Sequence, residues 1–499
     1  MRAPNSGFIT ISLATRSDFH RPRTCGRPFA SILVFAAMRR PRSLRRAGFW
    51  IGIGLTVVAL SCTPPLGASQ SAESRQTTPA AGQNAAATKK ALAEYTLGLK
   101  YYNGEGVTPD YQQAISWFRK SAEQGYAEAE YNLATMYAHG KGTPEDDQQA
   151  ISWYRKAAAQ GIVEAQYNLG MMYSRNSPPD LPQAALWFRK AADRGYANAQ
   201  SHLGLMYEVG NGVPQDSKQA ILWYQKAAEQ GAVDAQTNLA MMYMTGNGTP
   251  VDDSQGRALL LKAAEKGYPD AQFDYGVTYA KGIGVARDPV QAATWFRKAA
   301  DQGYAPAQFN LGLLYKKGDG VAQDLPQAAT WFRKAADQGN RYAQFKLGAA
   351  YELGKGVAKD PQQAAFWYRK AGEQGYAIAQ DSLGAMYAKG DAIPRDFPQA
   401  VSWFRKAADQ GYADGEYNLG VAYTNGDGVA KDLPQAALWL RKAADQGHDL
   451  AQNRLGVMYA RGLGVKQDLP QAATWYRKAI AQGNADAQYN LSQIAAKEK

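Results

Sequence analysis

The stretch QAATWFRKAADQG at residues 327–339 decides the fold, because close copies of it recur along most of the chain. The copies place a large apolar residue in the same register at Trp117, Trp153, Trp187, Trp223, Leu259, Trp295, Trp331, Trp367, Trp403, Trp439 and Trp475. Successive positions are 36 residues apart, except for the 34 residues between Trp153 and Trp187. A fixed period of this length is typical of a solenoid built from stacked supersecondary units. The sequence therefore predicts eleven repeats over residues 90–483 and a terminal half-unit over 484–499, which caps the stack.

Each unit reads as two helices joined by a glycine turn. In the copy at residues 268–303, Ala271, Tyr275 and Tyr279 lie four residues apart and share one face of a helix, which we name helix A. The turn GIGV follows, and then a second helix, helix B. An aspartate N-cap followed three residues later by glutamine predicts a capping box at the start of helix B. This DLPQ motif begins at Asp324, Asp432 and Asp468.

Small residues set the ends and the packing of helix B. Glycines such as Gly303, Gly339 and Gly411 fit the left-handed position after a helix. Alanines beside each tryptophan predict close helix contacts, with tryptophan and the helix A leucines and tyrosines filling the core. Residues 259–261, Leu-Leu-Leu, replace Trp-Phe-Arg in one unit, which we expect to be a weak point or bend. The Arg-Lys pair after each tryptophan lies near the helix B C-terminus, where cations complement the dipole, and is interpreted as a solvated outer stripe.

The first 89 residues have the organisation of an export leader followed by a tether. Residues 39–46, RRPRSLRR, precede 14 apolar residues at 47–60, too short for the roughly 20 that a spanning helix needs. We therefore expect a signal peptide at 38–62 and an extension at 1–37 that is non-native or disordered, with Met1 and Met38 both open as the true start. Cys62 ends VALSC, which resembles a lipoprotein signal, so lipidation of Cys62 and plain cleavage beside it both stay open. The polar residues 63–89 predict a disordered linker.

Charge and cysteine usage exclude several function classes. The chain carries a net charge of +12, but residues 1–61 hold ten arginines and one acid, so they contribute +9 and the remainder only +3. This distribution argues against nucleic-acid binding by the repeats. Both cysteines, Cys25 and Cys62, lie in the leader, so the repeats form no disulfide framework.

The units resemble the Sel1-like repeat, a relative of the tetratricopeptide repeat. The resemblance rests on AxAQYNLGxMYxxGxGVxxDxxQAxxWFRKAADQG and covers 394 of the 499 residues. It implies an all-α fold, a right-handed α/α superhelical solenoid of helix-turn-helix repeats with a C-terminal capping helix. It also implies an adaptor of membrane-associated or secreted complexes. A cysteine-rich branch of this family is linked to β-lactam cleavage, but its bridging cysteines are missing here.

Tetratricopeptide relatives bind ligands on a concave surface lined by A helices, and some clamp a peptide carboxylate with an asparagine before the helix A Leu-Gly. The corresponding positions, here named the A-helix row, are Asn132, Asn168, His202, Asn238, Asp274, Asn310, Lys346, Ser382, Asn418, Arg454 and Asn490. Asparagine is a poor residue for the middle of a helix, so its recurrence needs a reason. Either the row binds an extended peptide or glycan, or it forms hydrogen bonds between repeats. Specificity would lie at His202, Asp274, Lys346 and Arg454.

No motif in the chain predicts catalysis, a cofactor or a metal. The four histidines have no partner at helical spacing, and the GxGV turns lack the residues of a phosphate-binding loop. We expect a non-catalytic scaffold that binds a protein partner in the periplasm or at the outer membrane of a bacterium, held at the membrane only through the leader or a lipid on Cys62. The alternative is a carbohydrate or peptidoglycan binder, and a β-lactamase-like or amidase-like hydrolase is a distant third.

Overall fold

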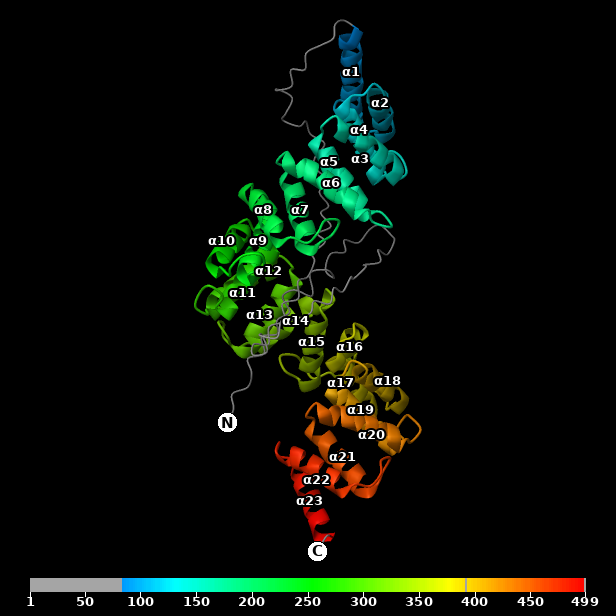
Figure 1. The fold of residues 1–499 in the computed structure, drawn as a ribbon, viewed down its shortest axis with the longest axis vertical. Helices are drawn as coiled ribbons and strands as arrows, with labels where there is room; N and C mark the ends of the chain where they lie inside the picture. The colour runs from blue at the N-terminus through cyan, green and yellow to red at the C-terminus, as the bar shows by residue number, and fades with distance from the viewer. Residues whose placement is uncertain (1–82, 391–392, 498–499) are drawn as a thin grey trace. The chain divides into compact units, whose positions relative to one another are not determined.

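The computed structural model describes residues 83–390 and 393–497, and this part of the chain contains 23 α-helices and no strand (Figure 1). The odd-numbered helices are the A helices and the even-numbered ones the B helices. The first eleven are α1 Gln83–Asn103, α2 Tyr111–Glu123, α3 Ala127–His139, α4 Asp147–Ala159, α5 Val163–Arg175, α6 Leu181–Asp193, α7 Ala197–Val209, α8 Ser217–Glu229, α9 Val233–Thr245, α10 Asp253–Glu265 and α11 Pro269–Lys281. The others are α12 Pro289–Asp301, α13 Ala305–Lys317, α14 Leu325–Asp337, α15 Arg341–Leu353, α16 Pro361–Glu373, α17 Ala377–Lys389, α18 Phe397–Ala408, α19 Ala413–Asn425, α20 Leu433–Asp445, α21 Asp449–Arg461, α22 Leu469–Ile480 and α23 Ala485–Lys497.

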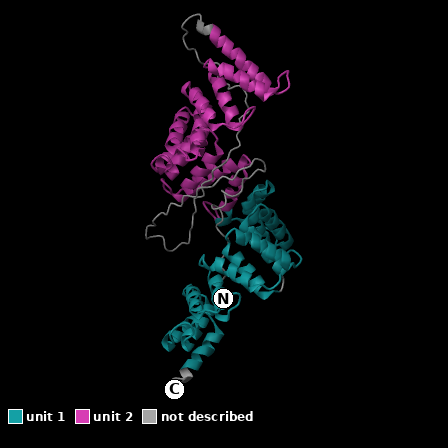
Figure 2. Ribbon diagram, turned by 90° about the vertical axis from the view of Figure 1, so that its right-hand side faces the viewer, with its two compact units in different colours: residues 1–57, 279–281, 287–499 teal, residues 58–278, 282–286 magenta. Residues whose placement is uncertain are grey.

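The described residues form two compact units (Figure 2). One contains residues 83–278 and 282–286, and the other contains residues 279–281 and 287–497. Within α1–α10 and within α12–α23, each helix packs against the helices before and after it in the chain. The predicted all-α repeat solenoid is confirmed.

The N-terminal boundary of the helical part differs from the one expected. Helix α1 begins at Gln83, so residues 83–89, which we assigned to the linker, are helical. The run Ala85–Ala87 has high intrinsic helix propensity, which the composition of the linker as a whole concealed. The expected extension at 1–37, the signal peptide at 38–62 and its Cys62 all lie outside the described residues.

Aspartate caps the B helices, but half of the expected capping box is wrong. The Asp324 carboxylate accepts a hydrogen bond from the Gln327 backbone N–H at 2.8 Å, as the motif predicts. The Asp324 N–H, however, donates to the Tyr315 carbonyl of helix α13 at 2.9 Å, and the Gln327 side chain does not bond to it. The same backbone bond joins Asp432 to Tyr423. The aspartate therefore fixes the end of the turn against helix A as well as the start of helix B.

Two kinds of glycine shape the connections between helices. The predicted left-handed glycines after helix B are confirmed, since Gly339 has φ of +89°. The second glycine of the GxG turn has a further role, shown by Gly356 with φ of +80°. A Cβ there would lie 2.2 Å from the carbonyl oxygen of Leu325, at the start of helix B of the preceding repeat. Only glycine allows this approach of two backbones.

The core between repeats is built as the sequence predicts. One cluster joins Phe309 of α13, Phe332 of α14 and Leu347 of α15 with several fully buried alanines. Trp367 of the next helix B covers the same cluster and is 6% exposed. Each tryptophan thus buries the core of the repeat before it, so neighbouring repeats depend on each other for burial. In α10, Leu260 stands where α12 has the core residue Phe296, and its side chain is 1% exposed. Whether this unit is a weak point stays a prediction.

Buried glutamines form a ladder along the repeats that the sequence did not reveal. Gln344 of α15 donates through Nε2 to the Ala336 carbonyl at 3.1 Å and accepts at Oε1 from Gln374 Nε2 at 2.7 Å. It thereby joins the helix B before it to the helix B after it. Equivalent pairs of bonds occur at Gln200, Gln308, Gln380 and Gln452. Because each of these buried amides both donates and accepts a hydrogen bond, it fixes the position of one repeat relative to the next.

Glu416 stands at a ladder position and supplies a test. Its carboxylate accepts from Gln446 Nε2 at 2.7 Å, but an ionised carboxylate has no donor for the carbonyl that glutamine would reach. Burial raises the pKa of Glu416 above its ordinary value, opposed by the hydrogen bond from Gln446. The ionised side chain therefore lowers the stability of the folded chain as the pH rises through this raised pKa.

We predict that Glu416→Gln raises the free energy of unfolding by about 1 kcal/mol at about pH 7, because it restores one hydrogen bond and removes a buried charge. The gain should shrink as the pH falls to about 4, where Glu416 is protonated in the wild type. Urea denaturation at both pH values measures it. The reciprocal change Gln380→Glu is the control and should lower stability at about pH 7 by a similar amount. Destabilisation by Glu416→Gln, or a gain independent of pH, would contradict the ladder.

Candidate functional site

The asparagines of the A-helix row bond mainly to the helix A of the preceding repeat. Asn132 Nδ2 lies 3.3 Å from the Tyr95 hydroxyl, and Asn168 Nδ2 lies 3.4 Å from that of Tyr131. Asn418 Nδ2 donates to Asp381 Oδ1 at 2.8 Å. Asn490 Nδ2 donates likewise to Asn453 Oδ1 at 2.9 Å. Each partner lies 37 residues earlier, so these bonds join equivalent faces of successive A helices.

The other two asparagines of the row have different partners: Asn310 bonds within its own helix, and Asn238 bonds to helix B of the preceding repeat. Asn310 is buried and donates to the Pro306 carbonyl at 2.9 Å, and Asn238 bonds to the Tyr224 hydroxyl. Hydrogen bonds between repeats, the structural explanation of the row, therefore have a geometric basis at five positions and not at Asn310. An amide has further donor and acceptor capacity beyond one bond, so a binding role for the row stays a prediction.

The remaining members of the row have distinct surroundings. His202 is half-buried, with its Nδ1 donating to the Asn198 carbonyl at 2.9 Å, and burial lowers its pKa. Asp274 is buried, and Ser382 is half-buried. Arg454 is exposed and donates through Nε to the Tyr417 hydroxyl at 3.1 Å. The row thus presents cationic, anionic and neutral groups at equivalent positions.

A mixed polar cluster surrounds Arg454. The Tyr417 ring stacks on the His448 ring with centroids 4.6 Å apart. His448 Nε2 lies 3.2 Å from Asp414 Oδ1, so the histidine joins an aromatic group to an acidic one. Burial raises the pKa of the nearby Asp381 to about 6, with the charge of Asp414 adding to this and the bond from Asn418 opposing it. The helices α17, α19 and α21 therefore offer a polar, partly acidic part of the row.

The Arg-Lys pairs lie at the exposed surface of the B helices, as expected, but they also make contacts that the sequence did not predict. The arginines donate to the hydroxyl of a helix A tyrosine 18 residues later, as Arg369 does to Tyr387 at 2.6 Å and Arg405 to Tyr423 at 2.5 Å. The lysines stack on the tryptophan of their own helix, with Lys406 Nζ 3.8 Å from the Trp403 ring centroid. Both cations are therefore part of the packing, since cation–π contact and the charged hydrogen bond stabilise the stack.

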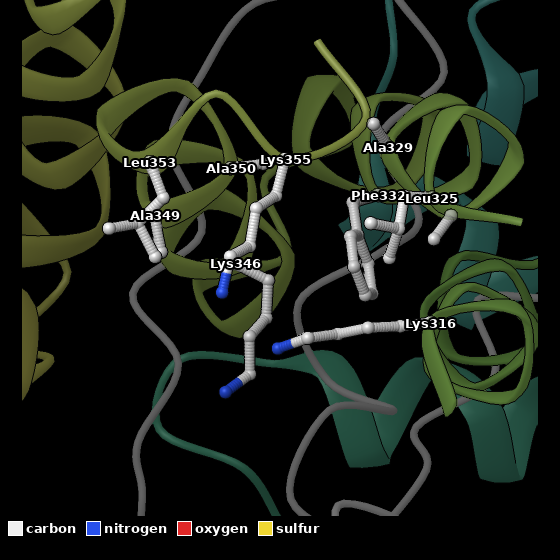
Figure 3. Close-up of a pocket in the computed structure, with 10 residues that line it drawn as sticks. Lys316, Leu325, Ala329, Phe332, Lys346, Ala349, Ala350, Leu353 and Lys355 are labelled. Carbon is white, nitrogen blue, oxygen red and sulfur yellow. The ribbon is translucent and has the colours of Figure 1, made fainter. Parts of the chain in front are cut away.

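Lys346 of the row lines the pocket shown in Figure 3. Its side chain and those of Lys316 and Lys355 extend toward one region, from α15, α13 and the turn after α15. Apolar side chains form the rest of the lining: Leu325, Ala328, Ala329, Phe332, Ala349, Ala350 and Leu353. The space is about 450 Å³, its open mouth included. Sequence reasoning named Lys346 but missed the other two lysines, which meet it only through stacking of the repeats.

Neither a metal-ligand cluster nor a membrane-spanning helix occurs among the described residues. Among residues 83–390 and 393–497, no group of three or more histidine, cysteine, aspartate or glutamate residues is placed to hold a metal ion. In the same part of the chain, no helix combines the length and apolarity needed to cross a membrane.

The comparisons with known proteins agree with this architecture. The family model described as Sel1 repeat matches eleven consecutive segments, at residues 91–126, 127–162, 163–196, 197–231, 233–268, 269–304, 305–340, 341–376, 377–412, 413–448 and 449–484. No curated protein matches the chain. A solved structure from uropathogenic Escherichia coli, described as a protective antigen with an SLR fold, is 40% identical and has a TM-score of 0.62, over 84% of this chain and 91% of that one.

A Sel1 repeat protein from Oxalobacter formigenes is 36% identical, with a TM-score of 0.49, over 62% of this chain and 89% of its own. The eleven matched segments coincide with the units that the tryptophan register defines, so the resemblance is confirmed. The chain belongs to the Sel1 repeat family, and its stacked helices form a repeat scaffold of the protein-interaction type.

Proposed function

We propose that this chain is an exported, non-catalytic scaffold of the bacterial cell envelope that binds a protein partner along the A-helix row. One observation carries the proposal: the row changes its chemistry from repeat to repeat while the packing beneath it is constant. His202, Lys346 and Arg454 interrupt a series of asparagines, whereas the capping aspartates and most ladder glutamines recur. Constant residues build the solenoid, so the variable ones are where a partner would be distinguished.

The export part of the proposal rests on the leader sequence. Residues 39–60 have the basic and apolar segments of a signal peptide, and Cys62 follows at the end of the apolar run. A lipid on Cys62 or simple cleavage beside it would both leave the repeats outside the cytoplasm. The polar linker that follows would let the repeats reach a partner at some distance from the membrane.

Photo-crosslinking at single positions of the full chain in its native cells tests the partner proposal. A crosslinking residue at Arg454 or His202, on the row, should capture one and the same protein. The matched control is exposed Thr330 of helix B, which should not capture that protein. Equal capture from both faces would contradict the assignment.

Capture of no protein, with co-sedimentation of the purified chain with peptidoglycan, would favour a glycan ligand instead. Muropeptide release or nitrocefin hydrolysis that a point change abolishes would contradict a non-catalytic role.

Mass spectrometry of the mature N-terminus tests export. We expect either a diacylglyceryl-modified Cys62 as the first residue or a terminus at or beyond Thr63. The first result establishes a lipid anchor and the second a cleaved signal peptide. A chain that retains residues 38–62 unprocessed would contradict both, and with them the envelope location.

A further inference from the structure

The pocket around Lys346 differs from the equivalent places in other repeats because its hydroxyl partners are missing. Two other repeats have a glutamate where this repeat has Lys316. Glu208 accepts a hydrogen bond from the Tyr224 hydroxyl at 2.8 Å, and Glu352 accepts one from the Tyr368 hydroxyl at 2.6 Å. Both of those tyrosines lie 16 residues later, where this repeat has Phe332. A lysine at this position therefore meets an apolar ring.

Lys346 likewise has a phenylalanine where the equivalent residues of other repeats have a tyrosine hydroxyl as partner. Asn132 and Asn168 bond to tyrosine hydroxyls 37 residues earlier, but the residue 37 positions before Lys346 is Phe309. Lys355, in the GxG turn, corresponds to Lys141, whose Nζ lies 2.7 Å from the Tyr102 hydroxyl. Lys316 replaces that tyrosine here. Lysines thus stand at three positions that find hydrogen-bond partners in other repeats, and Lys346 has instead a contact with the Phe345 ring, whose centroid lies 5.3 Å from its Nζ.

Positive charge in this pocket is not balanced by neighbouring acids. Within the described residues, the ammonium groups of Lys316, Lys346 and Lys355 have no hydrogen bond or ion pair. Asp319 pairs with Arg287 at 2.5 Å, and Glu352 accepts from Tyr368. Burial, together with the charges of Lys316 and Lys317, lowers the pKa of Lys346. An anion placed among these lysines would relieve their mutual repulsion.

We propose that this pocket binds a carboxylate attached to a small apolar body, with the carboxylate among Lys316, Lys346 and Lys355 and the apolar part against Phe332 and Leu353 (Figure 3). Cationic groups above an apolar lining are complementary to a ligand of this kind. The ligand is either a free organic acid or the C-terminal residue of a peptide, because both offer the same chemistry. The site shares Lys346 with the row, but the binding of this ligand does not depend on the row's proposed role in partner binding.

Titration calorimetry of the purified full chain, at constant ionic strength, tests the site with two probes. Sodium hexanoate represents a free organic acid and N-acetyl-leucine a peptide C-terminus. We expect at least one of them to bind, and the tighter one identifies the source. The neutral analogues 1-hexanol and N-acetyl-leucinamide should bind at least about tenfold more weakly, since they lack the charge.

Lys346→Gln is the test variant, because other repeats carry short polar side chains at this position and fold. It should weaken binding of the charged probe by about tenfold or more. Lys389→Gln is the control, since it removes the same charge from an exposed position outside the pocket lining. It should leave the affinity within about twofold of the wild type. Equal affinity for the alcohol and the acid, equal loss in both variants, or no binding of either acid would overturn the proposal.

Discussion

The close approach of two backbones at the second turn glycine is the constraint on which the stacking depends. Gly356 lies against the first turn of the preceding helix B, where a Cβ would come within 2.2 Å of the Leu325 carbonyl oxygen. Gly320 and Gly464 meet Pro289 and Leu433 in the same way. Because each turn rests on the repeat before it, the distance between neighbouring repeats is set by main-chain atoms. Side chains then pack within a spacing that is already fixed.

Three sets of side-chain contacts follow from this spacing. Gln344 and its equivalents connect consecutive B helices through buried amides, and the arginines of helix B reach the tyrosines of the next helix A. Tryptophans such as Trp367 cover the core of the repeat before them. With the interior determined in this way, the A-helix row can vary its side chains without loss of the fold. The pocket around Lys346 arises at one interface where three such variations coincide.

The parts of the fold that could be predicted depend on residues close together in the sequence. A capping aspartate, a glycine after helix B and a buried alanine act within one or two turns of a helix, so their patterns were sufficient. The ladder bonds between glutamines, the Arg–Tyr bonds and the approach of Lys316 to Lys355 join residues 18 to 39 positions apart, which meet only when the helices stack. The signal for the Arg–Tyr bond was present, since both residues recur in fixed register. The capping box was only half right for the same reason: the tight turn brings the Tyr315 carbonyl of helix A beside the Asp324 N–H, which donates to it.

A comparison of two glycine-to-alanine changes tests the stacking constraint most directly. Gly356→Ala and Gly339→Ala both place alanine at a positive φ, of +80° and +89°, which costs about 1–2 kcal/mol in either case. An added Cβ meets backbone at Gly356 but nothing within 4 Å at Gly339. Urea denaturation should therefore show a loss of stability for Gly356→Ala that clearly exceeds the loss for Gly339→Ala. Equal losses would contradict the claim that the turn glycine sets the distance between repeats.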